Sequence, residues 1–160
     1  MTIKVGDTLP KAEFTVPGAD GPEKKSTDDI FKGRKVVLFA VPGAFTPTCN
    51  AQHLPGYVID HDAIKAKGVD TIACTATNDV HVMKAWGRAT ASEGKILMLA
   101  DGNGAFAKAC GLDKDLTQFG MGHRSSRYSM IVDNGVVKAL NIETQSGVNV
   151  SGSETILKQL

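Results

Sequence analysis

Residues 41–49, Val-Pro-Gly-Ala-Phe-Thr-Pro-Thr-Cys, place one cysteine just after an apolar run. Pro42 and Pro47 stiffen the chain between that run and Cys49. If Thr46 is the N-cap of a helix, Pro47 takes the first helical position, where its missing N–H costs nothing. Cys49 then lies in the first turn, among free backbone N–H groups that stabilise a thiolate. The segment therefore predicts a reactive thiol rather than a cysteine that only packs in a core.

Ionisation alone does not make a fast enzyme. It increases the thiolate fraction only roughly 30-fold, which lowers the activation free energy by no more than about 2 kcal/mol. The Thr46 hydroxyl could accept from the Thr48 or Cys49 N–H and donate to sulfur or substrate. A fixed cation would stabilise the thiolate and polarise a substrate oxygen. Arg124 and Arg127 are the candidates, and Arg127 can reach Cys49 if the strand after it lies beside 35–41. The alternative is that both arginines are surface residues.

The elements that must position these residues alternate between strands and helices. Apolar runs predict buried strands at 35–41, 69–77 and 95–101. Two alternating strands span 127–143, joined by a turn at Asp133-Asn134-Gly135 that suits positive φ. A short strand followed by turn residues precedes them, at "AEFTV" and "PGADGPE".

Helices are predicted at 47–67 with a break at Pro55-Gly56, and at 79–90 with Asn78 or Asp79 as cap. In the second helix, Val82, Ala85, Trp86 and Ala89 are expected on one apolar face. Shorter helices follow, one ending at Gly111 and one at the C-terminus with Ser151 or Ser153 as cap. The fold class is therefore α/β: a central mixed sheet flanked by helices, with an N-terminal β extension. A thioredoxin-like sheet is one of the few topologies that fit.

Composition limits the function classes. The chain has 160 residues, 42% hydrophobic and 22% charged, which predicts one domain over 1–160. A net charge of +1 with scattered basic residues argues against nucleic-acid binding. No apolar run has the length of a membrane span, so we expect no membrane association and a cytoplasmic location. Three widely spaced cysteines form neither a disulfide framework nor a zinc motif.

Around residues 41–49 and 127–143 the chain resembles the peroxiredoxins, members of the thioredoxin-fold superfamily that includes the AhpC/TSA proteins. The pattern Pro-x-x-x-Thr-x-x-Cys falls on Pro42, Thr46 and Cys49, and the segment that carries the family's arginine places it at Arg127. Further stretches, "HLPGY", "NDVHVMKAWG" and "LADGNGAFAKACGL", are similar to the type II, peroxiredoxin-5-like subgroup.

The resemblance implies an antioxidant thiol peroxidase that reduces hydrogen peroxide and alkyl hydroperoxides, usually as a homodimer, without metal, haem or flavin. Cys49 would be the peroxidatic nucleophile that becomes a sulfenic acid. Thr46 and Arg127 would hold the peroxide oxygens, and Pro42 would shield the sulfur. Backbone N–H groups of 43–45 are expected near the same pocket.

How the sulfenic acid is reduced is left open by the sequence. The C-terminal stretch "GVNVSGSETILKQL" has no cysteine, unlike some relatives, whereas other relatives carry a second cysteine at the place of Cys74. Cys74 is either a resolving cysteine or a packing residue, and Cys110 is expected to pack. The default is an external thiol, with glutathione and glutaredoxin favoured over thioredoxin as partners.

Other interpretations have less support. The stretch "GNGAFA" fits a dinucleotide fingerprint, but no acidic residue ends a strand about 20 positions later. His53 could be the base of a cysteine hydrolase, although no third group to orient it can be identified. Thr46 replaces the first cysteine of a CxxC motif, which excludes a dithiol reductase. A non-enzymatic redox-sensing or chaperone-like module is the remaining alternative.

Overall fold

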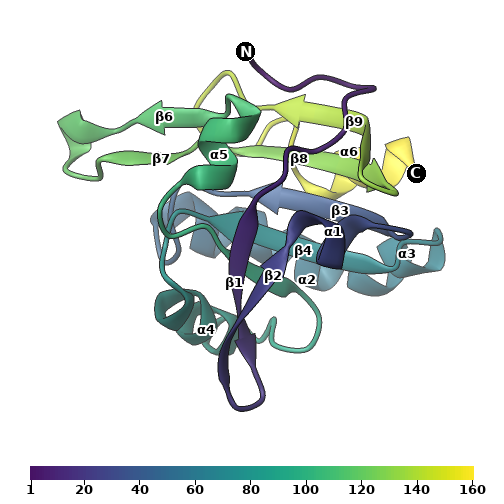
Figure 1. The fold of residues 1–160 in the computed structure, drawn as a ribbon, viewed down its shortest axis with the longest axis horizontal. Coiled ribbons are helices and arrows are strands. Elements are labelled where there is room, and N and C mark those ends of the chain that lie inside the picture. The colour runs from purple at the N-terminus through teal and green to yellow at the C-terminus, as the bar shows by residue number, and fades with distance from the viewer.

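The computed structural model describes residues 1–160 and is built on a seven-stranded mixed sheet (Figure 1). The strands of this sheet are β1 (Glu13–Gly18), β2 (Gly21–Ser26), β3 (Lys35–Ala40), β4 (Thr71–Ala76), β5 (Leu97–Ala100), β8 (Tyr128–Asp133) and β9 (Val136–Ile142). Their order across the sheet is β2-β1-β5-β4-β3-β8-β9. Strands β3, β4 and β5 are parallel, and β1 and β8 run antiparallel to their neighbours. The predicted fold class is confirmed.

Helices cover both faces of the sheet (Figure 1). They are α1 (Thr27–Phe31), α2 (Leu54–Ile59), α3 (His61–Ala66), α4 (Val80–Ala89), α5 (Ala105–Cys110) and α6 (Ser153–Gln159). Buried residues of α1 and α5 pack on one face, and those of α2, α3, α4 and α6 pack on the other. None of these helices combines the length and hydropathy that crossing a bilayer requires.

The central strand β3 contributes side chains to both faces because successive residues of a strand point in opposite directions. Val37 and Phe39 belong to the cluster under α2 and α4, and Val36 and Leu38 belong to the cluster under α1 and α5. All four are fully buried. This explains why the stretch reads as a continuous apolar run rather than an alternating one.

The β8–β9 hairpin turns as its sequence predicts. Asn134 and Gly135 have φ values of 50° and 79°, the left-handed conformation that a two-residue hairpin turn requires. A second, two-stranded sheet, β6 (Asp113–Asp115) with β7 (His123–Ser125), was not predicted. All three residues of β6 are exposed, so no apolar alternation marks it.

The predicted break at Pro55-Gly56 is wrong. The segment is helical from Pro47 to Ile59, and the break comes at Asp60, before α3. Residues Cys49–His53 form a π-turn in which the Leu54 N–H donates to the carbonyl of Cys49, five residues earlier. A proline inside a helix normally clashes with the carbonyl one α-turn back, and this wider turn admits Pro55 without ending the helix.

In α4 the predicted cap is confirmed, whereas the predicted apolar face is only partly buried. In α4 the buried residues are Val80, Met83, Trp86 and Gly87, whereas Ala85 and Ala89 are exposed. The cap of α4 is Asp79, whose carboxylate accepts from the Val82 N–H, as one of the two alternatives predicted.

Helix α6 begins after Gly152 and has no side-chain cap, so the predicted serine caps are wrong. The two serines bond elsewhere: Ser151 Oγ donates to Glu143 and Ser153 Oγ donates to Asp60.

Candidate active site

Cys49 lies beyond the carboxyl end of β3, on the loop and turn that lead into α2. Its thiol is fully buried within the larger core cluster. The loop before it contains Phe45 at φ 64°, an uncommon conformation for an aromatic residue, with half of the side chain exposed. The chain thus reverses sharply after β3, so that the first helical turn returns Cys49 to the edge of the sheet.

The Cys49 thiol is in contact with a guanidinium group. Nη2 of Arg127 donates to Sγ of Cys49 at 3.0 Å. Arg127 immediately precedes β8, which pairs with β3 so that Ala40 lies opposite Tyr128. The strand adjacency on which this contact was expected to depend is therefore present, and a permanent positive charge lies against the sulfur.

The other amino group of Arg127 is held by His53, on the turn after Cys49. Nη1 of Arg127 lies 2.9 Å from Nδ1 of His53, and Nε2 of His53 lies 3.0 Å from the carbonyl oxygen of Ser151. Because the carbonyl only accepts and the guanidinium only donates, Nε2 carries the hydrogen and Nδ1 accepts. His53 therefore fixes the direction of the guanidinium as a neutral imidazole.

The pKa of His53 is lowered to about 4, chiefly by burial and also by the nearby Arg127 charge, against the opposing effect of the Ser151 hydrogen bond. A residue that resists protonation and has both ring nitrogens occupied is not a general base near neutral pH. Arg127, not His53, contacts the sulfur. The cysteine-hydrolase interpretation therefore has no support in the geometry.

Arg124 has a different place from Arg127. Its Nη1 donates to the carbonyl oxygen of Pro42 at 3.3 Å, and its Nε donates to Met121 at 2.9 Å. Arg124 thus fastens the loop that carries Pro42 to the segment before β7. Of the two candidate arginines, one holds the loop and the other contacts the thiol.

The expectation that the Thr46 side chain caps the helix is wrong. Oγ1 of Thr46 donates to the carbonyl oxygen of Gly43 at 2.6 Å, and neither the Thr48 nor the Cys49 N–H bonds to it. The hydroxyl hydrogen is therefore used within the loop, and the oxygen lone pairs are left to accept from a substrate O–H. Thr46 is half-buried, as is Pro42.

The backbone N–H groups of 43–45 are only partly available to a pocket. The Ala44 N–H donates to Oδ1 of Asn78, which follows β4. This bond ties the loop to the neighbouring strand end. The N–H groups of 43–45 were expected near the pocket, and of these the Ala44 N–H is already bonded to Asn78.

The other two cysteines are buried free thiols. Cys74, in β4 opposite Phe39 of β3, belongs to the same core cluster as Cys49. Burial, together with the nearby Cys49, raises the pKa of Cys74 well above its ordinary value, and Arg127 opposes this. Cys110 packs in the other cluster, and burial raises its pKa to about 12.

The backbone N–H groups that a dinucleotide phosphate would need at "GNGAFA" are already bonded to a side chain of the protein. Both oxygens of the Asp101 carboxylate accept from the first turn of α5, from the N–H groups of Phe106 and Ala107. A phosphate would need the same donors and would meet a buried negative charge. No group of three His, Cys, Asp or Glu side chains is placed to hold a metal ion.

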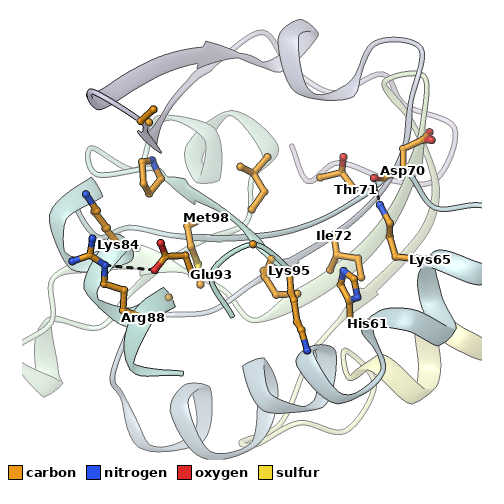
Figure 2. A pocket seen from close by; sticks show the side chains of 17 residues that line it. His61, Lys65, Asp70, Thr71, Ile72, Lys84, Arg88, Glu93, Lys95 and Met98 are labelled. Atoms are coloured by element: carbon orange, nitrogen blue, oxygen red, sulfur yellow. Dashed lines mark hydrogen bonds and ion pairs between the residues drawn. The ribbon is translucent and has the colours of Figure 1, made fainter. Parts of the chain in front are cut away.

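A cavity of about 710 Å³, shown in Figure 2, has no residue of the Cys49 loop in its lining. Thr71 and Leu97, which line it, begin β4 and β5, whereas Cys49 lies at the opposite end of these parallel strands. Its charged groups do not converge: Arg88 pairs with Glu93, and Lys65 donates to the backbone of Asp70 (Figure 2). The reactive thiol is therefore not part of this cavity.

A single thiol beside a fixed guanidinium, at the carboxyl end of the parallel strands, defines a thiol-based redox protein of thioredoxin-like fold. The family model described as Redoxin matches residues 4–157. The chain is 45% identical to Peroxiredoxin-2C of Oryza sativa subsp. japonica over 159 residues, covering 99% of this chain and 98% of that protein.

Among solved structures, the chain is 53% identical to reduced Prx3 from Vibrio vulnificus in complex with H2O2, with a TM-score of 0.94 and 98% of each chain covered. It is 36% identical to peroxiredoxin 5 from Alvinella pompejana, with a TM-score of 0.87, covering 98% of this chain and 97% of that one. The chain therefore belongs to the peroxiredoxins, oxidoreductases that reduce peroxide at the expense of a thiol.

Proposed function

We propose that Cys49 is the peroxidatic cysteine and that Arg127, Thr46 and Pro42 complete its site. The observation that carries this proposal is the 3.0 Å contact between the Arg127 guanidinium and the Cys49 sulfur. The thiolate attacks one peroxide oxygen, the O–O bond breaks, and the leaving oxygen takes a proton to depart as water or an alcohol. Sulfur is oxidised to a sulfenic acid, and the peroxide is reduced.

Each residue of the proposed site acts on a different charge or atom. Arg127 stabilises the thiolate and then the negative charge that develops on the leaving oxygen. The Thr46 oxygen accepts from the peroxide O–H and so orients the attacked oxygen toward sulfur. Pro42 covers the sulfur from bulk water. Because Cys49 is fully buried, hydrogen peroxide and small alkyl hydroperoxides fit the proposal better than bulky ones.

Steady-state peroxide consumption with a reducing thiol tests these assignments. Cys49→Ser should abolish turnover, and Arg127→Met should lower kcat/KM by roughly 10²–10³-fold. Arg88→Met is the matched control, since Arg88 is an exposed arginine paired with Glu93 on another part of the surface. Peroxide consumption by folded Cys49→Ser at the wild-type rate would overturn the proposal.

For the second half-reaction we propose an external thiol, with glutathione and glutaredoxin as the reductants. One thiol attacks the sulfenic sulfur and releases water, and a second thiol cleaves the resulting mixed disulfide. The position of Cys74 supports this: it is fully buried within β4, and its thiol resists ionisation. Resolution by Cys74 is the second candidate, favoured by its place in the same cluster as Cys49.

Intact-mass analysis after one equivalent of peroxide separates the two routes. A gain of one oxygen on Cys49 that glutathione converts to a mixed disulfide supports the external route. A loss of two hydrogens that maps to a Cys49–Cys74 bond would replace it by internal resolution. Equal turnover with thioredoxin and none with glutathione would also exclude the proposed reductant.

We also propose a homodimer formed near the site. Phe45 and Phe119 are exposed by 50% and 67% respectively, and exposed aromatic side chains on neighbouring segments suit a protein interface. Their segments are close, because Met121 reaches to within 3.6 Å of where a side chain on Gly43 would begin. Light scattering of Phe119→Glu against wild type tests this: the variant should be monomeric, and an unchanged mass would contradict the placement. A cytoplasmic location stays a prediction.

A further inference from the structure

Glu143, the residue after β9, organises the loop that leads to α6. Its Oε2 accepts three backbone hydrogen bonds of 2.8 Å, from the N–H groups of Asn149, Val150 and Ser151. The Ser151 hydroxyl donates to the same oxygen at 2.6 Å. Four donors on one carboxylate oxygen mean that the chain at 149–151 is wrapped around this charge.

The electrostatics of Glu143 agree with that arrangement. Partial burial alone would raise its pKa, but the hydrogen bonds from Ser151, Val150 and Asn149 more than offset this, and the pKa lies below its ordinary value. The carboxylate is therefore ionised throughout the neutral range. Its charge strengthens each of the four bonds relative to a neutral acceptor.

The loop held in this way presents the Ser151 carbonyl oxygen to the core. That oxygen accepts from the Tyr57 hydroxyl at 2.7 Å and lies 3.0 Å from Nε2 of His53. Tyr57 and His53 are both almost fully buried. The carbonyl thus determines which imidazole nitrogen carries the hydrogen, and no water competes for that position.

The tautomer that results decides where Arg127 points. With hydrogen on Nε2, the lone pair on Nδ1 is free to accept from Nη1 of Arg127, which turns Nη2 toward Cys49. The Arg127 backbone joins the same unit, because its carbonyl oxygen accepts from the Glu143 N–H at 3.0 Å. In the opposite tautomer, an Nδ1–H would face the guanidinium donors and push them away from that direction.

We propose that Glu143 is a positioning residue for peroxide reduction, which acts through the Ser151 carbonyl and the His53 tautomer to hold Arg127 against the Cys49 sulfur. Glu143 touches neither the sulfur nor the space for substrate. The inference rests on the proposed role of Arg127. It assigns a catalytic consequence to a carboxylate that is linked to the thiol by three successive hydrogen-bonded groups.

Two readouts distinguish positioning from a general structural role. The first is the rate of peroxide reduction compared with the rate of Cys49 alkylation by iodoacetamide, a reagent without a leaving peroxide oxygen for Arg127 to stabilise. The second is the nitrogen chemical shift of the His53 imidazole, which reports the tautomer directly. Wild-type protein should show only the Nε2–H form of His53.

Glu143→Ala removes the acceptor, and Glu143→Gln keeps one neutral carbonyl oxygen. We expect Glu143→Ala to lower the peroxide rate about 10–100-fold, as a small misplacement of a catalytic group does, and to lower alkylation much less. Glu143→Gln should recover part of the peroxide rate. Both variants should show an Nδ1–H population at His53. Glu154→Ala and Glu154→Gln, at an exposed carboxylate of α6, should match wild type.

A folded Glu143→Ala protein with the wild-type peroxide rate and a single His53 tautomer would overturn the proposal. Equal losses in peroxide reduction and alkylation, with the tautomer unchanged, would also overturn it, because they indicate a structural role only. If Glu143→Ala does not fold, the same two readouts on Glu143→Gln decide. If Arg127→Met retains activity, it is the proposed function that fails, independently of Glu143.

Discussion

The buried His53 makes the folding stability depend on pH between about 6.5 and 4. The side chain is 1% exposed, and burial, followed in effect by the Arg127 charge, lowers its pKa to about 4. In the unfolded chain an imidazole titrates near 6.5. Between these values the unfolded chain binds a proton that the folded protein does not, so acidification favours unfolding.

The sign and size follow from that difference. The contribution of neutral His53 is fully present above pH 6.5 and is lost as the pH falls through that value toward 4. The loss over the whole window is about 3 kcal/mol, a large part of the 5–15 kcal/mol that stabilises a typical domain. Carboxylates with lowered pKa values, such as Asp29 and Asp115, also make the protein less stable as the pH falls. The pH dependence of wild type alone therefore does not separate the contribution of His53 from theirs.

Urea unfolding of wild type, His53→Gln and His81→Gln at pH values from 7.5 to 4 separates these effects. His81 is exposed on α4 and serves as the control for removing an imidazole. The free energy of unfolding of wild type and His81→Gln should fall by about 3 kcal/mol more than that of His53→Gln across the window. If all three proteins lose the same free energy, the neutral buried state assigned to His53 is wrong.

Three further substitutions test the loop before Cys49 and the contact between Gly111 and the N-terminus. Thr46→Val should cost about 1 kcal/mol in urea unfolding, because it removes the bond to Gly43, and should also slow peroxide reduction; an unaltered rate would exclude the hydroxyl from substrate binding. Gly43→Ala should lower kcat/KM about tenfold, since its methyl would come within 2.9 Å of Arg124 Nη1 and displace the loop; wild-type kinetics would show that the guanidinium yields freely. Gly111→Ala should destabilise the fold by about 1–2 kcal/mol, because φ is +69° and the Met1 carbonyl occupies the space of a side chain; thermal unfolding at the wild-type temperature would contradict this.

The sheet could be predicted because its signals are local. A strand buried on both faces needs a continuous apolar run, as at 35–41, and a hairpin turn needs residues that accept positive φ, as at Asn134 and Gly135. From the sequence, the adjacency of β3 and β8 was only a condition, and the structure supplies it: Ala40 lies opposite Tyr128, which places Arg127 near Cys49. This part of the site follows from the order of the strands.

The remaining part of the site depends on contacts between residues distant in sequence. Ser151 lies 98 positions from His53, and nothing in the letters near either residue indicates that a backbone carbonyl will meet an imidazole. The π-turn was missed for a related reason: it depends on one shifted hydrogen bond, from Leu54 to Cys49, which has no residue pattern of its own. The proline after it, Pro55, was interpreted as a helix break because that is its usual effect.

Trp86, the single tryptophan of the chain, is joined to the residue after the thiol. Its indole N–H donates to Oδ1 of Asn50 at 2.9 Å, and the Phe45 ring lies 6.5 Å away, centroid to centroid. An opening of the turn at 49–53 that moves Asn50 away from Trp86 breaks that bond and changes the surroundings of the indole. Intrinsic fluorescence therefore provides a label-free optical signal of the turn's conformation, which stopped-flow mixing can follow in real time without a coupled enzyme.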